Sequence, residues 1–207
     1  INVKATKKLI QFANELEVRI LFASTVCAYG NNGEDVSSEN SPLAPTEVYA
    51  KSKVEAEKLF MGHLERHSIL RLATFYGPNM RSSLAVSIFI DAVVNDEEIR
   101  IHGNGLQTRC YTYVTDISSG IITVLNSKTN GIFNISSDEE TSVLGLIEMI
   151  SNIIGKEAKI KFVDDRFGQI TRSKIASEKL RELGWKPNYN LKSGLLKCIL
   201  FISNLKA

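Results

Sequence analysis

The segment EVYAKSKVEAEKL, residues 47–59, decides the interpretation of the fold because it places Tyr49 and Lys53 four residues apart. On a helix, residues i and i+4 lie on the same face, so a phenol and an amine would reach into the same cleft. Only one of the six tyrosines is followed by a lysine at this offset. The spacing alone also suits two ordinary exposed helix residues, so the flanking sequence has to decide its meaning.

Two apolar segments flank this helix. VRILFAS (residues 18–24) and SILRLAT (residues 68–74) are short, nearly continuous apolar runs, which is typical of strands buried on both faces. The helix between them is predicted to begin near Pro45 and to continue to about Leu64. Residues 1–16 carry apolar side chains at helical spacing and predict a further helix before the first strand.

The second half of the chain continues the alternation of strands and helices. Strands are predicted at residues 98–105, 107–114, 131–136 and 158–163, and helices at residues 116–126, 142–155, 177–185 and 191–202. Gly155 is expected to end its helix. Strands that alternate with helices predict an α/β fold with a largely parallel sheet.

Composition and charge exclude several classes of function. The chain is 43% hydrophobic and 23% charged, as is typical of globular proteins, and its net charge of +2 is too small to indicate a nucleic-acid partner. No apolar run approaches the ~20 residues of a membrane span, so no membrane partner is expected. Cys27, Cys110 and Cys198 are odd in number and widely spaced, which favours reduced thiols in a cytoplasmic protein over a disulfide or metal framework.

The Tyr49–Lys53 pair suggests a specific chemistry. A free phenol titrates at about pH 10. A neighbouring ammonium is expected to lower the pKa of Tyr49 toward the range useful for acid–base catalysis. The phenolate could then take a proton from a substrate hydroxyl while hydride leaves the same carbon, and the hydride acceptor would be a nicotinamide cofactor. Ser24 and Thr25 come at the carboxyl end of the first predicted strand, where open α/β sheets build their sites.

Six sequence blocks occur in a characteristic order. They are FASTVCAYG, YAKSKVEAE, RLATFYGP, GNGLQTRCYTYVTD, GIFNIS and LGWKP, spread from residue 22 to residue 187. This pattern resembles the extended short-chain dehydrogenase/reductase family, whose members include NAD-dependent nucleotide-sugar epimerases and dehydratases. The resemblance implies a Rossmann-type parallel sheet that lacks its N-terminal strands, followed by a smaller α/β substrate-binding domain. Residues 1–78 would belong to the NAD-binding domain and residues 79–207 to the substrate domain, with residues 107–135 returning to the Rossmann sheet.

The resemblance also implies roles for individual residues. Thr25 would hydrogen-bond the reacting hydroxyl, Tyr49 would be the acid/base, and Lys53 would hold the nicotinamide ribose. The residues expected to contact NAD are Ser24, Tyr49, Lys53, Leu72 and Ala73. No metal site is expected.

Three further residues would contact the nucleotide-sugar substrate. Arg109 and Arg166 match arginines that bind the diphosphate, which suits the fork geometry of a guanidinium. Either arginine could instead form a surface ion pair. Thr74 takes the place of an asparagine that contacts substrate phosphate.

One departure from the family pattern concerns the cofactor. No Gly-x-Gly-x-x-Gly or Gly-x-x-Gly-x-x-Gly occurs in the 207 residues. The family's glycine-rich turn, which meets the dinucleotide pyrophosphate, lies within roughly the first hundred residues of such an enzyme. The chain is therefore expected to be part of a longer protein and to be inactive by itself. A truncated, non-catalytic remnant is the alternative.

A second departure narrows the reaction. Val26 and Cys27 stand where the family's 4,6-dehydratases carry Asp-Glu, so an epimerase acting at C4 of a UDP- or dTDP-hexose is expected over a dehydratase. Cys27 also matches the acid/base cysteine of the family's 3,5-epimerase/reductases. Their second acid/base has no counterpart here except Arg81, whose pKa is too high. Cys27 also suits the role of a small packing residue. The resemblance further implies a homodimer.

Overall fold

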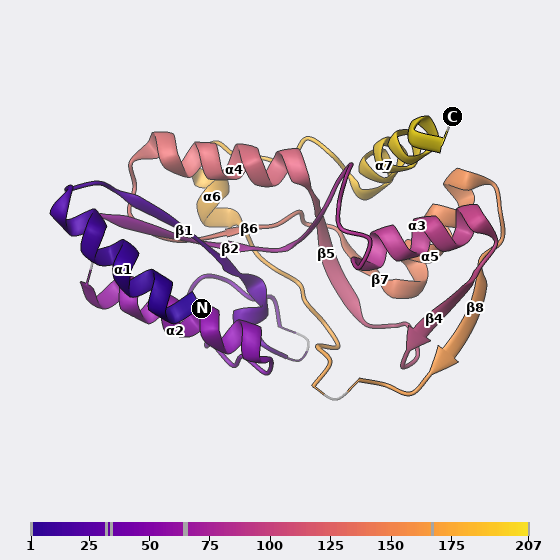
Figure 1. Cartoon of the computed structure of the whole chain (residues 1–207), viewed down its shortest axis with the longest axis horizontal. Helices are drawn as coiled ribbons and strands as arrows, with labels where there is room; N and C mark the ends of the chain where they lie inside the picture. Colours follow the sequence, from indigo (N-terminus) through magenta and orange to yellow (C-terminus); the bar gives the residue numbers. More distant parts are fainter. Residues whose placement is uncertain (1, 32, 34, 64–65, 167, 207) are drawn as a thin grey trace.

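A computed structural model describes residues 2–31, 33, 35–63, 66–166 and 168–206. Figure 1 shows strands flanked by helices along an elongated molecule. The elements are α1 (Asn2–Glu15), β1 (Ile20–Thr25), the 3₁₀ turn η1 (Val26–Tyr29), α2 (Val48–His63), β2 (His67–Leu72), β3 (Thr74–Tyr76), α3 (Ala85–Asn95), β4 (Glu98–His102), β5 (Thr108–Tyr113), α4 (Val114–Ser127), β6 (Gly131–Ile135), β7 (Glu140–Ser142), α5 (Val143–Ile154), β8 (Lys159–Val163), α6 (Glu178–Glu182) and α7 (Leu191–Lys206).

The first sheet is parallel and has the strand order β1-β2-β6. Its central strand is apolar on both faces, since Ile69 packs with α1 and α2 while Leu70 packs with α4 and α6. In Figure 1 the two helix pairs lie on opposite sides of these strands. This arrangement explains why the β2 sequence is apolar except at His67, Ser68 and Arg71, as expected for a parallel sheet covered on both faces.

The rest of the chain forms two smaller sheets around a second core. β5 pairs in parallel with β3 and antiparallel with β7, and β4 pairs in parallel with β8. Helices α3, α5 and α7 pack on them and bury apolar side chains such as Ile90, Ile147 and Leu195. β2 and β3 are separated by Ala73, whose N–H donates to the carbonyl oxygen of Ile135 at 3.0 Å. One extended segment therefore contributes to both parts of the molecule.

The predicted α/β fold with a parallel sheet is confirmed, and each predicted strand and helix has a counterpart. Helix α5 illustrates the local reasons: the Ser142 side chain accepts a hydrogen bond from the N–H of Gly145 at its start, and Gly155 ends it at φ 74°. The predicted end of α2, Leu64, lies outside the described residues. Within residues 107–135, β6 joins the first sheet, whereas β5 pairs with β3 and β7.

Helix α3 was not predicted. Its sequence AVSIFIDAVVN is almost entirely apolar, and six of its residues are buried. Its three polar residues, Ser87, Asp91 and Asn95, recur every four residues, and this helical spacing was the available signal. No helix in the described part of the chain is long and apolar enough to cross a membrane.

Candidate active site

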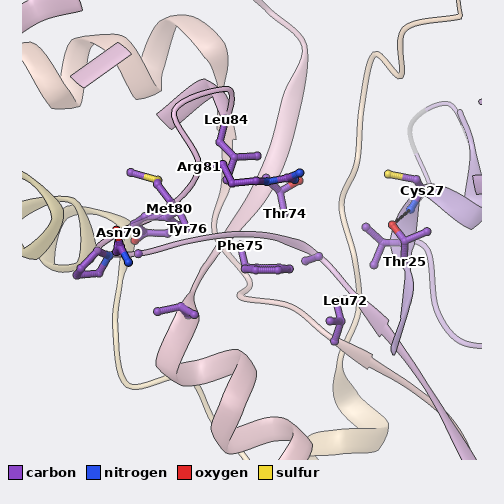
Figure 2. Close-up of a pocket in the computed structure, with 15 residues that line it drawn as sticks. Thr25, Cys27, Leu72, Thr74, Phe75, Tyr76, Asn79, Met80, Arg81 and Leu84 are labelled. Atoms are coloured by element: carbon purple, nitrogen blue, oxygen red, sulfur yellow. Dashed lines mark hydrogen bonds between the residues drawn. The ribbon is translucent and has the colours of Figure 1, made fainter. Parts of the chain in front are cut away.

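A cavity of about 450 Å³ opens where β1, β2 and β3 end. Figure 2 shows Thr25 and Cys27 on one side of it and Thr74, Phe75, Arg81 and Leu84 on the other. The lining residues are Thr25, Val26, Cys27, Leu72, Ala73, Thr74, Phe75, Tyr76, Gly77, Pro78, Asn79, Met80, Arg81, Leu84 and Val114. The carboxyl ends of parallel strands thus form a cleft, as open α/β sheets generally do.

Thr25 lies at the last position of β1, in register with Leu72 of β2. Its hydroxyl oxygen accepts a hydrogen bond from the N–H of Cys27 at 3.2 Å, which caps η1. The O–H of Thr25 has no acceptor within the described part of the chain. The hydroxyl is therefore fixed by the backbone and can donate to a group bound in the cleft.

Tyr49 and Lys53 lie on the same face of α2, as the spacing predicted. The Lys53 ammonium donates to the carbonyl oxygen of Ala23 at 2.8 Å, and it lies 4.8 Å from the centre of the Phe22 ring and 5.9 Å from that of the Tyr49 ring. The Tyr49 side chain is 51% exposed. Lys53 thereby ties α2 to β1, next to the residues that open into the cleft.

The electrostatic environment of Tyr49 differs from the sequence prediction. Burial raises the pKa of Tyr49, the Cys27 thiol adds to the rise, and the Arg81 guanidinium opposes it. Lys53, whose ammonium lies 5.9 Å from the centre of the Tyr49 ring, is not among the groups that change this pKa, so the predicted lowering of the Tyr49 pKa by Lys53 is wrong for this arrangement. Burial also lowers the pKa of Lys53, and the Glu57 carboxylate works against that change. At neutral pH, Tyr49 is a neutral phenol.

Ser24 does not face the cleft. Its side chain is buried, and its hydroxyl hydrogen-bonds the Oε1 atom of Glu57 on α2. Successive residues of a strand point to opposite faces, so Thr25 and Ser24 cannot both present their side chains to the same cavity. The Ser24 side chain is therefore occupied by Glu57, and the expected contact of Ser24 with the cofactor stays a prediction that only its backbone could meet.

Sequence reasoning missed the buried polar network behind the cleft. Arg71 on β2 forms an ion pair with Glu57 at 2.7 Å, and the two side chains are 3% and 0% exposed. Arg71 also donates to the hydroxyl of Tyr29, which in turn donates to Asn134 on β6 at 2.7 Å. A charged residue inside the apolar run SILRLAT was the signal for this network, because a buried arginine requires a partner.

The residues predicted to flank the nicotinamide lie at the cleft. Leu72 and Ala73 line the cavity where the chain passes from β2 to β3, and so does Thr74, which was predicted to contact the substrate. Thr74 is exposed toward it, and the Ala73 backbone is fixed by its bond to Ile135. Among the described residues, no group of three His, Cys, Asp or Glu side chains is arranged to hold a metal ion.

The two arginines predicted to bind diphosphate lie outside this cavity lining. The Nη1 atom of Arg109 donates to the carbonyl oxygens of Thr108 at 2.7 Å and Ile170 at 2.9 Å. Arg166 is exposed, and its backbone N–H donates to the side chain of Asp165. The structure thus fixes Arg109 against the loop that follows β8, while Arg166 lies on that loop.

Arg81 was considered from sequence only as an acid/base. In the structure it lines the cavity, is exposed, and acts electrostatically on Tyr49. It forms no ion pair with any residue that the structure describes. A guanidinium without a protein counter-charge at a cleft is a ready partner for an anionic group. Its position between residues 77 and 84, directly after the YGP turn, was the available signal.

Comparison with known proteins identifies a family model and relatives that match this chain. Residues 1–136 match the model of the NAD dependent epimerase/dehydratase family. The chain is 34% identical over 212 residues to bovine (Bos taurus) dTDP-D-glucose 4,6-dehydratase, an alignment that covers 96% of this chain and 60% of that protein. The chain spans about 60% of the length of the first curated relatives that it matches.

Two solved structures resemble the whole fold. The UDP-glucose 4-epimerase of Thermotoga maritima, solved with UDP-glucose, has a TM-score of 0.94 and 26% identity, covering 100% of this chain and 70% of that one. The UDP-glucuronic acid 4-epimerase of Bacillus cereus was solved with UDP-glucuronic acid and NAD. It has a TM-score of 0.93 and 28% identity, and the match covers 99% of this chain and 68% of that one. The parallel sheet is therefore of the Rossmann type, as the sequence predicted.

Proposed function

Because the chain belongs to the NAD dependent epimerase/dehydratase family, we propose that the cleft beside Thr25 carries out NAD-dependent epimerisation of a nucleotide sugar. The sugar is a UDP- or dTDP-hexose, and the inverted carbon is C4. The activity is proposed for the full-length protein that contains these 207 residues. Tyr49 and Lys53 are not among the residues that line the cavity. The observation that supports the proposal best is that Lys53 donates to the carbonyl oxygen of Ala23, two residues before Thr25 on β1, while Tyr49 lies near enough to Cys27 and Arg81 of the cavity lining for both to affect its pKa.

The roles of the three residues follow from their contacts. Tyr49 lies half-exposed beside the cleft. In its phenolate form it accepts the proton of the substrate hydroxyl, and it returns this proton in the second half-reaction. Thr25 donates its O–H to the reacting oxygen, because the hydroxyl oxygen accepts from the Cys27 N–H and its O–H is left for a bound group. Lys53 keeps two of its three donors after bonding to Ala23, and these suit the hydroxyls of a ribose.

The residues of the cleft fit the nicotinamide end of the cofactor. NAD, the cofactor of the family, supplies a hydride acceptor and donor when it is bound. Leu72 and Ala73 provide an apolar wall and backbone beside Thr25, which suits a flat ring and excludes water. The 207 residues contain no glycine-rich strand-to-helix turn, so no residues are assigned to the pyrophosphate.

Epimerisation is favoured over dehydration by the residues that follow Thr25. Val26 and Cys27 both line the cavity, and neither can supply a carboxylic acid for loss of water. Cys27 is close enough to affect the pKa of Tyr49. That contact favours a 3,5-epimerase/reductase that uses Cys27 as the second candidate function.

Solvent exchange separates these reactions. The protein is incubated with NAD⁺ and a panel of UDP- and dTDP-hexoses in D₂O, and products are followed by NMR. Epimerisation at C4 returns the same hydride, so we expect a C4 epimer without carbon-bound deuterium. Deuterium at C3 or C5 of a product that keeps its C6 oxygen would indicate the Cys27 reaction. A C6 methyl group with deuterium at C5 would indicate dehydration, because the hydride from C4 goes to C6 and the solvent supplies the hydrogen at C5.

The residue assignment is tested by Tyr49→Phe, with Tyr189→Phe as the matched control on the far side of the Tyr113 ring. Loss of the acid/base is expected to reduce kcat by about 10²- to 10⁴-fold. NAD binding, measured by calorimetry, should not change, and Tyr189→Phe should behave as the wild type. Near-normal turnover by Tyr49→Phe would contradict the assignment.

The protein is also proposed to be a homodimer and to be cytoplasmic. Leu9 and Phe12 on α1 and Leu16 directly after it form an exposed apolar stripe, and Met61 of α2 is exposed as well. A second copy of the chain would cover this surface. The three cysteines form no disulfide, which suits a reducing compartment.

A further inference from the structure

Three elements that reach the cleft meet at one buried carboxylate. Glu57 of α2 is fully buried, and its Oε1 atom accepts from the hydroxyl of Ser24, the residue before Thr25 on β1. Arg71 of β2, the residue before Leu72, donates to it through Nε at 3.2 Å and through Nη2 at 2.7 Å. Ser24 directly precedes Thr25 and Arg71 directly precedes Leu72, whereas Glu57 lies one helical turn after Lys53. Each side chain of this cluster is therefore next to a residue proposed to act in catalysis or in cofactor binding.

Glu57 occupies a specific place on α2. It comes one turn after Lys53 and two turns after Tyr49, so the three side chains share one face of the helix. Whatever fixes Glu57 against β1 and β2 also fixes the rotation of this face and its position along the helix axis. The bond from Lys53 to the Ala23 carbonyl is the second tie between α2 and β1.

The outer side of Arg71 is fixed as well. Its Nη1 atom donates to the Tyr29 hydroxyl at 3.0 Å and to the Glu39 carbonyl at 3.3 Å. Asn134 accepts from Tyr29 and donates to the Ala176 carbonyl at 2.9 Å. The guanidinium fork is thus held on both sides and cannot rotate away from the carboxylate.

Stability alone does not explain such a pair. Burial of two charges carries a desolvation penalty, and apolar residues of similar volume are often as stabilising or more so. Apolar contact is non-directional, however, whereas a bidentate fork and a hydroxyl donor fix position and angle. A directional contact is what a reaction geometry requires, because small misplacements of reacting groups have large effects on rate.

We propose that Glu57 is a positioning residue, whose carboxylate, held by Arg71 and Ser24, places Tyr49 and Lys53 against Thr25. The inference rests on the proposed function for the roles of those three residues. It assigns Ser24 to the support of α2 in place of the cofactor contact predicted from sequence.

The charge of Glu57 gives a readout that does not depend on activity. The groups that face the Lys53 ammonium are the Ala23 carbonyl and the Phe22 ring from β1, and Tyr49 and Glu57 from its own helix. Burial lowers the pKa of Lys53 and Glu57 opposes this. In Glu57→Gln the opposing charge is gone, so Lys53 loses its proton at a lower pH than in the wild type.

The first experiment is pH-dependent labelling of the lysines with acetic anhydride, read by mass spectrometry on the purified chain. In Glu57→Gln, half-labelling of Lys53 should move to lower pH, while the exposed Lys51 on the same helix stays unchanged. Glu140→Gln is the matched control, since Glu140 is also held by an arginine fork, from Arg172, and by a hydroxyl, from Thr108. This control should leave Lys53 unchanged, and an unchanged Lys53 in Glu57→Gln would count against the proposal.

The second experiment measures turnover in the protein that carries the chain. Glu57→Gln and Ser24→Ala should lower kcat by about 10- to 100-fold and leave KM within about threefold, because placement acts on the reacting groups. Ser24→Ala keeps the ion pair and serves as the test if Glu57→Gln does not fold. Wild-type kcat in both variants, with Tyr49→Phe inactive, would overturn the positioning role. An active Tyr49→Phe variant would instead overturn the proposed function. Because this outcome is read from turnover and not from lysine labelling, the two failures can be told apart.

Discussion

The ammonium of Lys53 donates to the carbonyl oxygen of Ala23 at 2.8 Å and lies 5.9 Å from the centre of the Tyr49 ring. Lys53 therefore connects helix α2 to strand β1. The charges that bear on the pKa of Tyr49 come from Cys27 and Arg81, which belong to other elements. Burial is the largest cause of the raised pKa of Tyr49, and these two residues, which lie outside its helix, also affect this pKa.

Arg81→Gln should move the pH dependence of turnover. Arg81 lowers the pKa of Tyr49 against the rise caused by burial, so its removal raises that pKa further. A reaction that needs the phenolate then reaches half of its maximal kcat at a higher pH than in the wild type. The check is the pH profile of kcat, with Arg100→Gln on the exposed face of β4 as the control. A midpoint that stays in place or moves to lower pH would refute the electrostatic link.

Thr25→Val removes a hydroxyl and keeps the volume of the side chain. Loss of one fixed donor to a reacting oxygen is expected to lower kcat by about 10²-fold. The cap of η1 is lost too, which should reduce the free energy of unfolding by about 1 kcal/mol. Thr25→Ser keeps both functions and should recover most of the activity and stability. Equal kcat values for the Val and Ser variants would argue against a hydrogen bond from Thr25.

Asp116→Ala tests the connection between α4 and the segment before α7. The buried carboxylate of Asp116 accepts the backbone N–H groups of Asn188 at 3.0 Å and Tyr189 at 3.1 Å. Both donors would lose their partner, so the free energy of unfolding should fall by about 2–3 kcal/mol in urea titrations. Asp138→Ala removes a more exposed carboxylate paired with Arg181 and should change it by less than about 1 kcal/mol.

Phe12→Asp tests the proposed dimer surface on α1. The Phe12 side chain is 60% exposed within the apolar stripe, and a charge there would have to be buried by a second copy. We expect a monomer in sedimentation-velocity experiments, whereas the wild type sediments as a dimer. Leu125→Asp, on the exposed side of α4, is the control and should sediment as the wild type does. A dimeric Phe12→Asp would exclude this surface.

The sequence predicted the parts of the structure that depend on local pattern. The apolar runs before Thr25 and through Leu70 identified the strands, because strands buried on both faces need little polar sequence. Tyr49 and Lys53 were placed together by helical periodicity alone. These features need no knowledge of what packs against them.

The errors came from features that depend on tertiary neighbours or on a rule that was not applied. The alternation of side chains along a strand already excludes a shared direction for Ser24 and Thr25. The partners of Arg71 and the environment of Tyr49 come from elements far apart in the chain, so no local pattern contains them. Helix α3 was missed because the stripe formed by Ser87, Asp91 and Asn95 was overlooked in an otherwise apolar sequence.

The fixed guanidinium of Arg109 has a thermodynamic consequence for ligand recognition. Its Nη1 atom is held by two carbonyl oxygens, while Nε and Nη2 make no hydrogen bond to the described residues. Freezing an arginine side chain opposes association by about 1–2 kcal/mol of rotamer entropy. Here that entropy is lost during folding, so an anion that meets Arg109 binds a side chain that is already ordered. Calorimetry would register this as a smaller entropic penalty on binding than a freely rotating arginine would give.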